Sequence, residues 1–183
     1  MNAKEMIKEI EKEDEMRQGN ISLILEGYND LFSDFDPRPT EQRALSDDFL
    51  IECKRAARDK ELGLELRLLI PKAKRNMTEE TKIKKRIRVH FNKYYKEKLS
   101  DIKKLRIEGG LLCLAGIALS ITATFIYSNT SFLSTLALVI LEPAGWFSIW
   151  NGLDKLFFEV RGKKPELDFY KKMANANVSF ISY

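Results

Sequence analysis

Residues 109–150 read GGLLCLAGIALSITATFIYSNTSFLSTLALVILEPAGWFSIW, and this stretch decides the fold. Glu142 is its only acidic or basic side chain, although the whole chain carries 31 Lys and Arg and 27 Asp and Glu. A hydrocarbon core of about 30 Å requires about 20 apolar helical residues. Segments 109–127 and 132–150 each approach this length, and the short polar connection between them allows only an antiparallel turn. The sequence therefore predicts a transmembrane helical hairpin of two spans.

Basic residues flank both ends of this hairpin and are missing from its tip. Lys103, Lys104 and Arg106 precede the first span. Four more follow the second span: Lys155, Arg161, Lys163 and Lys164. Because loops rich in Lys and Arg stay on the cytoplasmic side of a membrane, we expect an integral protein of the cytoplasmic membrane with both termini in the cytoplasm.

Outside the hairpin, the sequence alternates strands and helices. The run ISLIL at 21–25 is typical of a buried strand, and leucines alternate with other residues at 62–68, the pattern of a half-buried strand. A helix that begins at Thr40 or Ser46 lies between them, which predicts two parallel strands joined by a right-handed crossover. The run VSFISY at 178–183 reads as a third strand. We expect it to return to one of the first two strands.

The expected fold class is therefore α+β, with a two-span hairpin and a small cytosolic α/β domain of about three strands. Residues 1–107 form the first cytosolic part, which ends in a long basic stalk helix at 78–107. Residues 108–151 form the hairpin. Residues 152–183 form an interfacial helix, a short helix and the terminal strand, so that the cytosolic domain is built from both sides of the hairpin.

Local signals set the expected helix boundaries. A short charged helix is expected at 2–17. Thr78 is expected to cap the stalk helix, with acids in its first turn. Gly162 and Pro165 are expected to interrupt the chain before a last helix at 166–174.

The pair Glu142-Pro143 is the most unusual feature of the hairpin. A count of about 1.5 Å per residue from the start of the second span places Glu142 about 15 Å deep, near the bilayer midplane. A carboxylate there costs about 3 kcal/mol or more, so it should face protein or water. An antiparallel hairpin brings it near Ser120 and Thr122 of the first span. We interpret these residues as a membrane polar site, either a pore, proton or ion site or a structural glutamate bonded across helices. A shallower span, with the acid at the interface, is a further alternative.

Small residues form a line along the first span. They are Gly109, Cys113, Gly116, Ser120 and Thr124. Small side chains let helices approach closely in lipid, where hydrophobicity does not drive their association. We expect this line to serve helix packing within the hairpin and between hairpins, and hence to favour a homo-oligomer.

A loop rich in charge follows the first expected strand. It contains Asp34, Asp36, Arg38 and Arg43. The aspartates could hold a divalent cation and the arginines a phosphate, which makes this a possible ligand loop. Ordinary turn chemistry is the alternative, because the spacing fits neither a calcium loop nor a nucleotide-binding motif.

No catalytic residues, metal site or cofactor can be assigned from the sequence. There is one His, at position 90, and no P-loop or Ser/His/Asp set. The basic helix 82–106 points to anionic lipid headgroups as a partner, more than to nucleic acid. We expect a small oligomeric membrane protein, not an enzyme, whose cytosolic domain couples a signal or ligand to the membrane around Glu142. A membrane-anchored scaffold for a protein partner is the alternative, followed by a membrane enzyme acting on a phosphorylated substrate.

Overall fold

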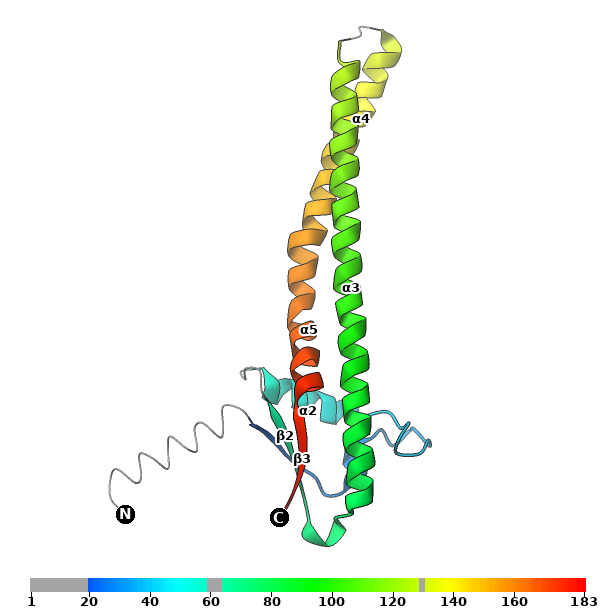
Figure 1. The fold of residues 1–183 in the computed structure, drawn as a ribbon. Coiled ribbons are helices and arrows are strands. Elements are labelled where there is room, and N and C mark those ends of the chain that lie inside the picture. Colours follow the sequence, from blue (N-terminus) through cyan, green and yellow to red (C-terminus); the bar gives the residue numbers. More distant parts are fainter. Residues whose placement is uncertain (1–19, 59–63, 129–130) are drawn as a thin grey trace, which may run out of the picture. The chain divides into compact units, whose positions relative to one another are not determined.

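The computed structural model describes residues 20–58, 64–128 and 131–183 of the chain. It is mostly helical, with one small parallel sheet and two long apolar helices (Figure 1). The chain divides into two compact units, one of Met1–Tyr95 with Asp168–Tyr183 and one of Lys96–Leu167. The helix expected at 2–17 lies outside the described residues.

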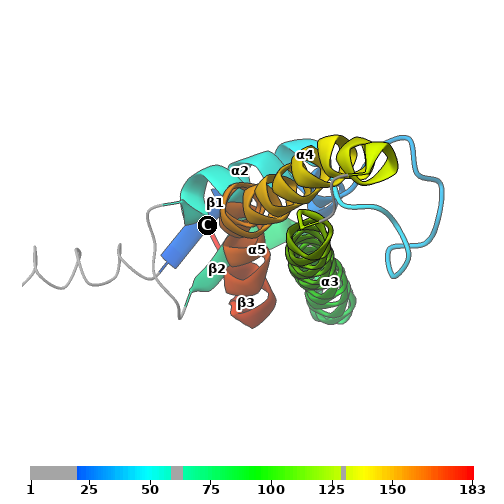
Figure 2. The ribbon, with the colours of Figure 1, turned by 90° about the horizontal axis from the view of Figure 1, so that it is seen from above.

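The first unit contains three parallel strands in the order β1-β2-β3 (Figure 2). They are β1 (Asn20–Ile24), β2 (Glu65–Ile70) and β3 (Asn177–Ser182). The prediction that the C-terminal strand returns to the sheet is confirmed, and β2 is its partner. Residues from the two ends of the sequence therefore build one sheet.

One face of the sheet carries the core of this unit. Its apolar side chains come from all three strands, since Ile21 lies beside Leu66 in the register and Phe180 lies beside Leu68. All four are buried together with residues of α2 (Asp47–Ala57), α3 (Met77–Ile126) and α5 (Val160–Asn175). Right-handed connections between consecutive strands of this order all cross the same face, which explains why the helices gather there.

The opposite face of the sheet is not covered by described residues. Ile24, Leu69 and Ile181 lie in one register row across the three strands on this face. The side chain of Ile24 is 73% exposed. Parallel sheets usually have both faces covered, so an exposed face is unusual for a sheet of this kind.

The starts of two helices differ in their capping. The helix α2 begins at Asp47 with Ser46 at the N-cap position, which selects Ser46 over Thr40, although its side chain makes no capping hydrogen bond. The predicted cap at Thr78 is wrong. The side-chain oxygen of Asn76 accepts the backbone N–H groups of Thr78 at 3.0 Å and of Glu79 at 3.4 Å. Asn76 thus bonds to the second and third helical residues, as an N-cap does.

The second unit is helical. The helix α3 continues without a loop from the first unit into the first apolar segment, and α4 (Phe132–Asp154), the π-turn η3 (Lys155–Glu159) and α5 follow one another directly. Within the described residues, the helical stretches Met77–Ile126 and Phe132–Asn175 are long and apolar enough to cross a membrane, by length and composition.

The predicted helix break at Gly162 and Pro165 is wrong, because both residues lie inside α5. A proline inside a helix removes one hydrogen bond and costs about 3 kcal/mol. Here Val160 and Leu167, on either side of Pro165, pack against Ile102 and Leu105 of α3. We attribute the continuity of the helix to this packing and to its earlier nucleation in α4.

Candidate functional site

The two apolar helices α3 and α4 meet through glycines on both sides. A Cβ atom added to Gly116 would lie 2.6 Å from the carbonyl oxygen of Gly145. A Cβ atom added to Gly152 would lie 2.6 Å from the carbonyl oxygen of Gly109. Such distances exclude any larger side chain without a shift of the backbone. The four glycines therefore form a closed seam between the helices, which we call the glycine seam.

The structure brings most of the expected small-residue line of α3 into this seam. Cys113 points its sulfur at the carbonyl oxygen of Ile149, 3.7 Å away. The hydroxyl of Ser120 lies beside Gly145 and donates to the carbonyl oxygen of Gly116 at 3.0 Å. The line thus serves packing within one hairpin.

Thr124 lies outside the seam. It is exposed, and its hydroxyl donates to the carbonyl oxygen of Ser120 at 3.0 Å. Ala123, which is 3% exposed, continues the buried line instead. Positions 109, 113, 116, 120 and 123 of this line follow one another by alternating steps of four and three residues, the period of helices that pack along their length. Thr124 would require two consecutive steps of four, which turns its side chain away from the partner helix.

Gly145 and Gly152 were missed in the sequence analysis. They are seven residues apart in α4, as Gly109 and Gly116 are in α3. A matched heptad spacing of glycines on two adjacent spans is a signal that close helix packing leaves in a sequence. This signal could have found the seam.

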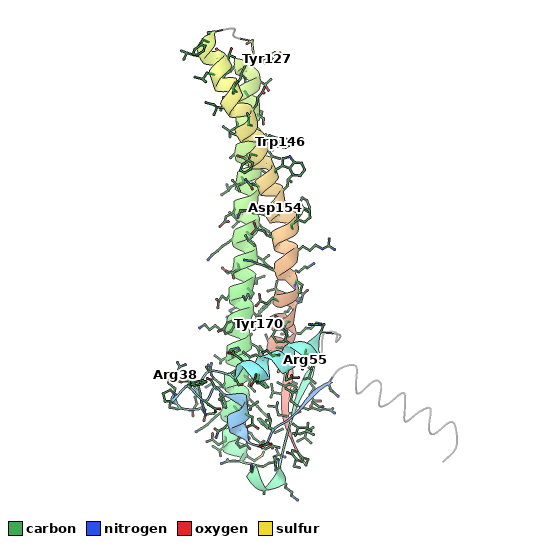
Figure 3. All side chains as sticks on the ribbon, turned by 180° about the vertical axis from the view of Figure 1, so that it is seen from behind. Arg38, Arg55, Tyr127, Trp146, Asp154 and Tyr170 are labelled. Atoms are coloured by element: carbon green, nitrogen blue, oxygen red, sulfur yellow. The ribbon has the colours of Figure 1, made fainter. Side chains whose placement is uncertain are left out.

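Glu142 lies beside the seam and not within it. Its side chain is exposed, and none of the described residues forms a hydrogen bond or ion pair with it. Glu142 lies one helical turn before Trp146, a residue of α4 that is 66% exposed (Figure 3). The side chain of Glu142 is therefore exposed next to the contact between the two helices.

The other residues of the expected polar site do not gather around Glu142. Ser120 lies opposite Gly145, about one helical turn farther along α4. Thr122 is exposed, and its hydroxyl donates to the carbonyl oxygen of Ala118 at 2.8 Å. Pro143 lies inside α4 and is exposed. One hairpin thus supplies no polar environment for the acid.

An ion pair lies at the base of the two apolar segments. The Lys155 ammonium is 3.3 Å from the carboxylate of Glu108 on α3 and 3.8 Å from that of Glu159. Glu108 directly precedes Gly109, and Lys155 follows Gly152 by less than one turn. The polar boundary therefore lies at the same level on both helices.

The aspartates and arginines of the charged loop 33–44 pair with one another. The Asp36 carboxylate accepts hydrogen bonds from Arg38 Nε at 2.8 Å and Nη2 at 2.7 Å, and from the Ala44 N–H at 2.6 Å. These donors hold the pKa of Asp36 well below its usual range, the Arg38 side chain having the largest effect. Asp36 and Arg38 thus fix the loop conformation.

Arg43 closes the same loop from its other end. Its guanidinium donates to the Ser33 carbonyl oxygen at 3.0 Å and to Asn29 Oδ1 at 3.2 Å, and it lies 3.6 Å from Asp34. The described residues contain no group of three or more His, Cys, Asp or Glu placed to hold a metal ion. This geometry favours the turn-chemistry interpretation of the loop.

Two buried polar groups of the first unit were not identified as such from the sequence. Glu80, 3% exposed, accepts two hydrogen bonds from Arg75, at 2.8 and 2.9 Å, and one from Tyr28 at 3.1 Å. Arg75 is the main cause of the lowered pKa of Glu80. His90 is 8% exposed, its Nε2 has no partner among described residues, and its ring lies 4.5 Å from that of Tyr94. Burial lowers the pKa of His90 to about 4, so both groups belong to the core of this unit.

Comparisons with protein-family models, with curated proteins and with solved structures find no match to this chain. The features that carry chemical information are therefore those of its own structure. They are the glycine seam, the exposed acid Glu142 beside it and the ion pair at its base.

Proposed function

We propose that this chain is a small integral protein of the cytoplasmic membrane that self-associates, with Glu142 at the contact between hairpins. Residues 109–150 cross the bilayer twice, and both termini lie in the cytoplasm. The basic residues beside the Glu108–Lys155 pair support this orientation, because positive charge is retained on the cytoplasmic side.

The observation that carries the proposal is the exposed position of Glu142 beside a closed seam. The side chain of Glu142 is exposed beside the closely packed glycines, and the single hairpin leaves it without a partner among the described residues. A lipid-facing carboxylate about 15 Å deep costs about 3 kcal/mol or more. A second hairpin that packs on this side of α4 removes the acid from lipid and supplies polar neighbours.

The assembly couples the cytosolic domain to the membrane. The helix α3 contributes Ile83, Ile87 and Phe91 to the core of the first unit and then continues into the first apolar segment. A ligand or partner that alters the packing of these residues acts on a helix that also belongs to the hairpin. Carboxylates of several copies near one axis favour cations, so the expected consequence of coupling is a change in cation permeability.

The experiment compares wild-type protein with Glu142→Gln in detergent and in liposomes. The matched control is Glu97→Gln, the same chemical change at an exposed residue of α3 outside the apolar segments. The proposal predicts oligomers for all three proteins, cation flux for the wild type and the control, and loss of flux for Glu142→Gln. A wild-type protein that is monomeric in lipid and carries no flux would contradict it.

The second candidate function is that of a membrane-anchored scaffold whose cytosolic domain binds a protein partner. The glycine seam favours it, because the contacts between Gly116 and Gly145 leave no path for ions within one hairpin. In this case the wild type and Glu142→Gln conduct equally little, and only the stability of the assembly responds to the substitution.

A further inference from the structure

A hollow of about 310 Å³ lies between α3 and the edge strand β3 in the first unit. It is lined by Lys84, Lys85, Arg88, Asn177 and Val178. Three of these five residues are cationic and none is acidic. The hollow therefore combines a concave surface with a concentrated positive charge.

The cations of this hollow differ from their neighbours on the same helix. Lys82 pairs with Glu41 at 3.1 Å, and Arg86 donates to the carbonyl oxygen of Arg43 at 2.8 Å. The side chains of Lys85 and Arg88 are exposed and have no hydrogen bond or ion pair with any described residue. Lys82 and Arg86 thus bind other residues of the unit, whereas Lys85 and Arg88 remain available to bind a ligand.

Lys84 is held at the edge of the hollow. Its ammonium lies 5.8 Å from the ring centroid of Phe180 on β3. Glu80, one turn earlier on α3, is already bound by two hydrogen bonds from Arg75. Arg75 thus lowers the pKa of Glu80 more than Lys84 does, and the ammonium of Lys84 lies beside the ring of Phe180 on β3.

The edge strand adds backbone donors. The N–H of Asn177 bonds to the carbonyl oxygen of Leu64 at 3.0 Å and so points into the sheet. Because successive peptide groups of a strand point to opposite sides, the N–H of Val178 points outward at the edge, where β3 has no further strand beside it among the described residues. An anion in the hollow can accept from this N–H and from the three cations.

We propose that this hollow is a binding site for a phosphate-bearing ligand. Lys84, Lys85 and Arg88 supply its charge, and the edge of β3 supplies a backbone donor. Phosphate oxygens are the acceptors that Arg and Lys bind with the greatest strength. The same chemistry is offered by a soluble diphosphate and by the headgroup of an anionic lipid. The site is independent of the role proposed for Glu142.

The test uses the full chain in nanodiscs of neutral lipid, with pyrophosphate as the probe and calorimetry as the measurement. The triple variant Lys84→Gln, Lys85→Gln, Arg88→Gln is compared with a control triple, Lys72→Gln, Lys93→Gln, Lys171→Gln, which removes the same charge from exposed positions of the same unit. We expect binding to the wild type, affinity within about twofold for the control and a loss of about tenfold or more for the first triple.

Two arms identify the source of the phosphate. If the site binds a lipid headgroup, pyrophosphate binds the wild type more weakly in nanodiscs with phosphatidylglycerol than in neutral nanodiscs. If the site binds a soluble ligand, the affinity for pyrophosphate is the same in both kinds of nanodisc. Equal losses of affinity in both triple variants would show a general charge effect and would overturn the proposal. No binding to the wild type in neutral nanodiscs would overturn it as well.

Discussion

Substitution of Gly116 by Ala is expected to destabilise the hairpin through one added methyl group. The new Cβ would lie 2.6 Å from the carbonyl oxygen of Gly145 and from Cγ1 of Ile149, whereas ordinary contact begins at 3.4 Å. The helices must therefore separate locally by about 0.8 Å. A gap of this size loses about a quarter to a half of the dispersion energy of the atoms that line it.

The expected net effect is a loss of about 1–2 kcal/mol. Insertion of a methylene into a packed site costs about 1–3 kcal/mol, and Ala recovers up to about 1 kcal/mol over Gly by its helix propensity. The matched control is Gly110→Ala, because a Cβ at Gly110 on the same helix meets nothing within 4 Å. The control should be as stable as the wild type or more so.

The assay is a titration of the protein in mixed micelles with dodecyl sulfate, followed by tryptophan fluorescence. Both tryptophans of the chain, Trp146 and Trp150, lie on α4, so their fluorescence reports on the unfolding of this helix. The midpoint for Gly116→Ala should fall below that for Gly110→Ala. Equal midpoints for the two variants would refute the close contact at the glycine seam.

Three further predictions concern the first unit. Glu80→Gln should lower the free energy of unfolding by about 2 kcal/mol, because it weakens a buried, hydrogen-bonded ion pair; Glu79→Gln is the control, and chemical denaturation measures both. The pKa of His90 is lowered from 6.5 to about 4, so the unfolded chain binds more protons between these pH values. The free energy of unfolding should therefore fall by about 3 kcal/mol as the pH drops from 6.5 to 4. A His90→Phe variant that kept this step would contradict the assignment. Asp36→Asn should loosen the loop 33–44 and speed tryptic cleavage after Arg43; an unchanged rate would show that the carboxylate does not hold the loop.

The sheet could be predicted from the sequence because each strand carries its own signal. The runs at 21–25 and 178–183 are apolar and short, and the leucines of β2 alternate with other residues. The burial of all three strands can therefore be read from the sequence alone. Which strand would lie in the centre was not predictable. The pairing of β3 with β2 depends on the connection through α3, α4 and α5, whose path the local pattern does not contain.

The helix boundaries show where local signals were misleading. Pro165 is a strong breaker in isolation, yet packing of Val160 and Leu167 against α3 outweighs it. Thr78 is a good cap residue, but Asn76 lies two positions earlier and accepts the N–H groups of Thr78 and Glu79, so the helix begins before Thr78. In both cases a contact or a competing residue decided the outcome.

The sequence was sufficient to single out Glu142, but it did not determine which residues surround it. The sequence identified Glu142 as unusual because it is the one acid in an apolar block. Its relation to Ser120 depends on the register of the two helices, which the pairing of Gly116 with Gly145 determines. The charged loop was likewise recognised, and the structure adds that Asp36 pairs with Arg38 and that Asp34 lies 3.6 Å from Arg43.

We propose that the hairpins of two copies meet on the side of α4 that carries Glu142. The most direct measurement is disulfide cross-linking in liposomes of a variant with Glu142→Cys, in a background where Cys53 and Cys113 are replaced by Ala. The control is Ile140→Cys, which is also exposed and lies two residues away on the opposite side of the helix. We predict cross-linked dimers for Glu142→Cys and few for Ile140→Cys. Equal cross-linking at both positions, or none at Glu142→Cys, would contradict the account.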